Sequence, residues 1–127
     1  MTRDPASDIQ IEVETAYLDA ESDPDTGRYV FAYTITIRNE GERTARLLTR
    51  HWRITDANGK VQEVHGDGVV GEQPELKPGE GFQYTSGTHL ETSMGTMAGR
   101  YGMVDAEGAE FDAPIPEFLL TIPRTLH

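Results

Sequence analysis

Cysteine is absent from this chain of 127 residues, and basic residues and long apolar runs are scarce. Without cysteine there is no disulfide and no thiolate ligand for a metal ion. No apolar run approaches the roughly 18 residues of a membrane-spanning helix. The opening MTRDPASD also lacks the apolar stretch of a secretory signal. We therefore expect a cytoplasmic protein with no membrane partner.

The charge balance argues against nucleic acid as a partner. The chain has 11 Lys and Arg against 22 Asp and Glu, and its net charge of −11 repels a phosphate backbone. Five basic residues nevertheless concentrate in one segment: Arg43, Arg46, Arg50, Arg53 and Lys60. This segment is either a solvated strand face or a patch that docks an acidic partner. In the second interpretation, Arg46, Arg50 and Arg53 are the candidate partner-binding residues.

Alternation of apolar and polar residues predicts strands along most of the chain. Segments 9–18 (IQIEVETAYL) and 29–37 (YVFAYTITI) each place an apolar side chain at almost every second position, which is typical of strands with one buried face. Further strands are expected over 44–55, 60–64, 81–86, 95–104, 109–115 and 118–122. Turn sequences separate them, including the hairpin signal Asn58-Gly59. We predict one all-β domain over 1–127, a sandwich of about seven antiparallel strands in two sheets, with residues 1–8 as a flexible lead.

Segment 44–55 (TARLLTRHWRIT) fits either a helix or a strand. A helix would align Leu47, Leu48, His51 and Trp52, whereas a strand would align Leu48, Trp52 and Ile54. We favour the strand because the segment runs directly into the Asn-Gly hairpin. Trp52 is expected in the core, as in sandwiches of the immunoglobulin type, rather than on a binding face.

Glycine and proline mark irregular positions in the last strands. Gly99 and Gly102 lie inside one predicted strand, which indicates a bulge or a close backbone approach. Pro114, Pro116 and Pro123 cannot donate to a sheet ladder. The last strands are therefore expected at a sheet edge or at a switch between sheets.

The stretch HGDGVVGEQP carries a G-x-G-x-x-G spacing at Gly66, Gly68 and Gly71. In dinucleotide-binding folds the last glycine opens a helix whose amides hold a pyrophosphate. Here EQPELKPGEG follows, and its prolines leave no room for that helix. A glycine-rich turn is the favoured interpretation. The alternative is a nest of amides that binds phosphate, pyrophosphate or a nucleotide with its cation.

Other candidate chemistry is weak. Glu63, His65 and Asp67 would share one strand face and suit a divalent metal, but their tips would stand ~6–7 Å apart. A solvated face is favoured over direct binding of Co²⁺ or Mg²⁺, so we predict no metal site and no cofactor. Ser86 and His89 are the only close nucleophile–base pair, and no nucleophile elbow surrounds Ser86. We therefore expect no enzymatic activity.

Several segments resemble the bacterial ApaG family. They are RYVFAYTITIRNEG, HWRITDANGKVQEVHGDGVVGEQPELKPGE, FQYTSGTHLETSMGTMAGRYGMVDAEG and FDAPIPEFLLTIPRTLH, and GVVGEQP followed by PGE and YTSG is the most specific part. The resemblance implies a fibronectin-type-III-like sandwich with no established catalytic activity, associated with cobalt resistance and magnesium efflux. It also implies a pyrophosphate-binding loop at Gly66, Gly68 and Gly71. Related domains in eukaryotic F-box proteins imply a role in protein–protein contacts, so we expect a non-enzymatic module that binds a protein partner.

Overall fold

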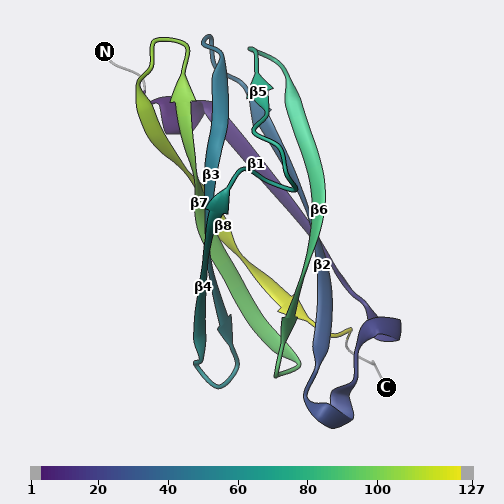
Figure 1. Ribbon diagram of the computed structural model, residues 1–127. Coiled ribbons are helices and arrows are strands. Elements are labelled where there is room, and N and C mark those ends of the chain that lie inside the picture. Colours follow the sequence, from purple (N-terminus) through teal and green to yellow (C-terminus); the bar gives the residue numbers. More distant parts are fainter. Residues whose placement is uncertain (1–3, 124–127) are drawn as a thin grey trace.

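The computed structural model describes residues 4–123 and contains two antiparallel sheets packed face to face (Figure 1). One sheet has the order β1 (Ile9–Tyr17), β2 (Tyr29–Asn39), β6 (Gly81–Leu90). The other has the order β4 (Val61–Asp67), β3 (Ala45–Asp56), β7 (Met94–Asp105), β8 (Glu110–Thr121), and the two-residue β5 (Glu75–Leu76) also pairs with β3. The predicted all-β sandwich in two sheets is confirmed.

Helical structure in the described residues is limited to three short 3-10 helices, at Pro5–Asp8, Asp19–Glu21 and Pro24–Thr26. None of these helices is long and apolar enough to cross a membrane. The first falls within the predicted lead at residues 1–8, and the side chain of Asp4 accepts a hydrogen bond at its start. Residues 1–3 of that lead lie outside the described residues.

The core lies between the sheets and follows the predicted alternation. In β2, Phe31, Ile35 and Ile37 are buried and alternate with more exposed neighbours. Trp52 of β3 is only 2% exposed and meets the Tyr33 ring edge-on, with ring centroids 5.4 Å apart. The expectation that Trp52 belongs to the core is confirmed. Full burial of an Ile or Phe side chain contributes about 1.5–3 kcal/mol to folding.

A β-bulge at Leu48 changes which side chains of β3 face the core. The register of β3 on β7 shifts between Leu47 and Thr49, so one residue is left over on β3. Leu47 is therefore fully buried together with Trp52 and Ile54, whereas the sequence pattern placed Leu48 with them. That part of the prediction was wrong because a bulge shifts the alternation by one residue.

The β3–β4 hairpin and the β7 glycines appear as predicted. Asp56 closes the hairpin by accepting hydrogen bonds from the amides of Asn58 and Lys60, both 2.9 Å long. A Cβ at Gly99 would run into the carbonyl oxygen of His51, and one at Gly102 into the Thr49 hydroxyl. The expected close backbone approach is confirmed at Gly99, whereas Gly102 makes room for a side chain.

The C-terminal strand differs from the prediction in one respect. The sequence suggested two strands, 109–115 and 118–122, but β8 runs without a break from Glu110 to Thr121. The register on β7 instead shifts across Pro116, between Ile115 and Phe118. Prolines are tolerated there because β8 is an edge strand hydrogen-bonded to β7 alone, as the expected edge position allows.

Candidate functional site

The G-x-G-x-x-G segment forms the end of β4 and a tight turn after it. The amide of Val69 donates to the carbonyl of Glu72 (2.8 Å), and the amide of Glu72 donates back to Val69 (2.9 Å). Between them Val70 and Gly71 have φ values of 43° and 82°, the two positive angles of a type I′ turn. The amide of Gly68 donates to a β3 carbonyl at 2.8 Å. Carbonyls of the chain thus occupy three amides that an anion nest would need.

Gly66 makes room for Arg50. The two residues face each other across β4 and β3, and a Cβ at Gly66 would lie 2.6 Å from the guanidinium carbon. The guanidinium crosses this space and donates to the carbonyls of Asp67 (2.9 Å) and Gly68 (3.0 Å). Arg50 thereby holds the start of the turn against β3.

The bulge places Arg46 on the same face as Arg53 and apart from Arg50, among the three arginines predicted to bind a partner. Arg50 pairs with Tyr101 of β7, whose ring is fully buried, so Arg50 points to the inner face. Arg46 and Arg53 are exposed on the outer face of the sheet. The Arg46 guanidinium forms an ion pair with Glu75 at 3.1 Å. Only two of the three share a face, and their role in partner binding stays a prediction.

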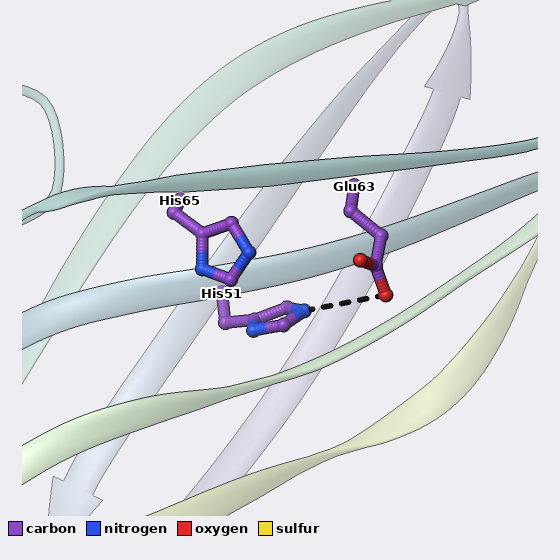
Figure 2. A group of neighbouring side chains, drawn as sticks. All are labelled: His51, Glu63 and His65. Carbon is purple, nitrogen blue, oxygen red and sulfur yellow. Dashed lines mark ion pairs between the residues drawn. The ribbon is translucent and has the colours of Figure 1, made fainter.

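Three side chains with metal-ligating atoms meet on the outer face of β3 and β4 (Figure 2). His51 lies directly opposite His65, with ring centroids 4.0 Å apart and an interplanar angle of 66°. The Nε2 atom of His51 lies 3.8 Å from a carboxylate oxygen of Glu63. One ligand atom from each of the three residues falls within 4.8 Å of the others.

Sequence reasoning grouped Glu63 and His65 with Asp67 and missed His51. Residues two apart on one strand point the same way but stay separated, whereas a residue directly across a hairpin is a close neighbour. The Asn58-Gly59 turn could have indicated that His51 and His65 lie opposite each other, because it fixes the centre of the hairpin. Counting seven residues outward from Asn58 in both directions reaches His51 and His65, which the structure pairs.

A polar cavity of about 510 Å³ adjoins this cluster. Its lining includes His51, His65, Asp67, Arg100 and Asp112, which come from four adjacent strands. Arg100 is the β7 neighbour of His51, and its Nε atom lies 3.8 Å from a carboxylate oxygen of Asp112 on β8. Carboxylates therefore offset the positive charge beside the histidines.

Ser86 and His89, the nucleophile–base pair considered from the sequence, are not brought together. Ser86 lies opposite the buried Tyr33, whereas His89 lies opposite Val30 and is exposed. Because side chains alternate along a strand, these two residues of β6 point to opposite faces of their sheet. The arrangement offers no hydrogen bond that could activate the serine.

The fold and the site together describe a class of protein. It is a two-sheet β-sandwich in which the glycine motif forms a turn and the outer face carries a histidine–glutamate cluster. The ApaG domain model matches residues 19–105. Protein ApaG of Stenotrophomonas maltophilia (strain K279a) is 60% identical over 119 residues, 94% of each chain. Protein ApaG of Azoarcus sp. (strain BH72) is 57% identical over the full length of both chains. A crystal structure of an ApaA protein from Bordetella pertussis superposes with a TM-score of 0.90 at 52% identity and covers 93% of this chain and 96% of that one.

The chain therefore belongs to the ApaG family, and the resemblance seen in its sequence is confirmed. The match includes the fold, a fibronectin-type-III-like sandwich.

Proposed function

We propose that this chain is a non-enzymatic cytoplasmic module that binds another protein through the outer face of its five-stranded sheet. The supporting observation is where its exposed apolar side chains lie. Four large hydrophobic residues are exposed among residues 4–123, and three of them, Val61, Met94 and Leu119, belong to this sheet. Their exposed fractions are 49%, 44% and 51%.

The strand register gathers these three side chains at one end of the outer face. Val61 lies opposite Thr55, Thr55 opposite Thr96, and Thr96 opposite Leu119, which makes one row across four strands. Met94 is two residues before Thr96 and shares its face. Met94 and Leu119 also line a groove of about 620 Å³ that reaches β1. Met94 and Leu119 thus lie together beside this groove, and Val61 lies at the opposite edge of the row, beyond Thr96 and Thr55. Exposed apolar side chains that adjoin a groove mark an interaction surface.

Arg46 and Arg53 lie on the same outer face and would supply contacts to carboxylates of the partner. Arg53 is two residues from Thr55 and borders the row, whereas Arg46 lies nine positions from Thr55, toward the other end of β3. Arginine beside exposed apolar side chains is common at protein interfaces. A module of this kind would take part in cobalt resistance or magnesium efflux, the roles that the family resemblance implied, through the protein that it binds. Anion binding at Gly66, Gly68 and Gly71 has less support, because the amides of Gly68, Val69 and Glu72 donate to carbonyls of the chain.

The test compares the proteins retained by immobilised wild type and by surface variants. Leu119→Glu and Val61→Glu place charge in the apolar row, and Gln83→Glu places it on an exposed position of the other sheet as the matched control. Proteins from a native lysate that bind wild type and Gln83→Glu should be depleted at least tenfold on both row variants. Circular dichroism verifies that each variant is folded. If the row variants retain the same proteins as wild type, this face is not the interface.

A further inference from the structure

We propose that His51, Glu63 and His65 form a binding site for a divalent transition metal ion of borderline softness, such as Zn²⁺. This proposal is independent of the protein-binding proposal and rests on the cluster shown in Figure 2. The site lies on the outer face of the β3–β4 hairpin, between the polar cavity and the row that begins at Val61, two residues before Glu63 on β4.

The ligand atoms already lie near the separations that such an ion requires. Tetrahedral coordination with bonds of about 2.1 Å places ligand atoms about 3.4 Å apart. The His51 Nε2 to Glu63 Oε1 distance is 3.8 Å, and the whole set falls within 4.8 Å. Side-chain movement of about 1 Å would close the site. Glu63 and His65 are exposed and free to make that movement.

His51 is the fixed member of the set. Its side chain is 17% exposed. Its backbone packs closely against β7, because Gly99 has no Cβ to contact the His51 carbonyl. Its Nδ1 atom is buried and finds no hydrogen-bond partner among the described residues. Its Nε2 atom is too far from Glu63 for a hydrogen bond. The Nε2 atom is therefore the ring nitrogen of His51 that can reach an ion, and no hydrogen bond within the described residues holds it in another role.

The donor set determines the class of metal ion. Two imidazoles and one carboxylate suit Zn²⁺ and its neighbours in the transition series, whereas Mg²⁺ and Ca²⁺ require oxygen ligands. Asp67 lies on the same face, two residues beyond His65, and adds negative charge beside the site. Arg100 adds positive charge, which Asp112 offsets. Three protein ligands leave the remaining coordination positions open toward the polar cavity, for water or for a group from another molecule.

The experiment is calorimetric titration of the untagged full-length chain with Zn²⁺ and, separately, with Mg²⁺. We expect saturable Zn²⁺ binding at one site per chain and no saturable Mg²⁺ binding. His65→Ala and Glu63→Gln alter exposed side chains, so the fold should persist, and each should weaken Zn²⁺ binding at least tenfold. His89→Ala removes an exposed histidine from the other sheet and should leave the affinity unchanged.

Histidine side-chain NMR spectra recorded during the same titration locate the ion. The imidazole resonances of His51 and His65 should shift together and saturate, while those of His89 should not move. Zn²⁺ binding that survives both His65→Ala and Glu63→Gln would overturn the proposal, as would no binding at millimolar Zn²⁺. Leu119→Glu changes β8, which β7 separates from the ligand strands β3 and β4, so with this variant the two proposals can fail separately.

Discussion

Replacing each glycine of the G-x-G-x-x-G motif by alanine should destabilise the fold to three different degrees. If the motif is a turn, the cost at each position depends on what an added methyl group would meet. At Gly68 it would run into the carbonyl oxygen of Glu72, and at Gly66 into the Arg50 guanidinium. At Gly71 it would meet nothing within 4 Å.

The magnitudes follow from these contacts. Gly68 has a φ of 63°, which costs alanine about 1–2 kcal/mol, and displacement of backbone adds about 1–3 kcal/mol. Gly66→Ala displaces a flexible side chain that makes two hydrogen bonds, for about 1–3 kcal/mol. Gly71→Ala should lower the free energy of unfolding only by the cost of a positive φ for alanine, about 1–2 kcal/mol. Alanine also restricts the unfolded chain, which offsets about 0.4–1 kcal/mol in each variant. The expected order of loss is Gly68, then Gly66, then Gly71.

Urea denaturation followed by circular dichroism measures these free energies of unfolding. A double-mutant cycle tests the mechanism at Gly66, because the cost of Gly66→Ala should largely vanish in an Arg50→Ala background. Equal losses at all three positions, or a neutral Gly68→Ala, would refute the reasoning. An unchanged cost of Gly66→Ala without Arg50 would refute the role assigned to that arginine.

Three further predictions concern the core and the loop. Trp52→Ala should lower the free energy of unfolding by about 3–5 kcal/mol, measured by far-ultraviolet circular dichroism, and a loss below about 1 kcal/mol would contradict its buried position. The buried hydroxyls of Tyr84 and Tyr101 share a 2.5 Å hydrogen bond, and burial raises the pKa of both above its ordinary value. Since only the unfolded chain releases these protons near pH 10, stability should fall above about pH 10 by about 1.4 kcal/mol per pH unit for each tyrosine. The double variant Tyr84→Phe/Tyr101→Phe should lose this dependence of stability on pH, measured by urea denaturation at several pH values. An unchanged dependence would mean that other groups cause it. Addition of ATP, GTP or pyrophosphate, with or without Mg²⁺, should leave the amide NMR signals of 66–71 in place, and saturable shifts there would favour the anion-binding alternative.

Strand content was predictable from the sequence because it depends on local alternation. The pattern of 29–37 was confirmed in β2, and the ambiguous segment 44–55 is the strand β3. The Leu48 bulge was not predictable, because the extra residue is defined only by the pairing of β3 with β7. Its consequence is that Arg46 faces outward with Arg53, whereas unbroken alternation would have placed Arg46 on the inner face with Arg50. The positions of Arg50 and Arg53 follow from their spacing to Trp52, but the outward position of Arg46 was visible only in the structure.

The candidate sites depended on structure to different extents. That the glycine motif is a turn was the favoured interpretation from its prolines alone, but the role of Gly66 as space for Arg50 was visible only in the folded chain. The apolar row also needed the register, because Val61 and Leu119 are 58 positions apart in the sequence and lie in strands separated by two others.

The residue pattern alone was sufficient for the all-β sandwich, its hairpin at Asn58-Gly59 and the burial of Trp52, because turn chemistry and period-two burial act over a few neighbouring residues. Tertiary structure decided which side chains became neighbours. The meeting of His51 with Glu63 and His65, and the gathering of Val61 with Leu119, both follow from strand register. Register is fixed by packing and by bulges between segments that are distant in the sequence, and no single segment contains that information.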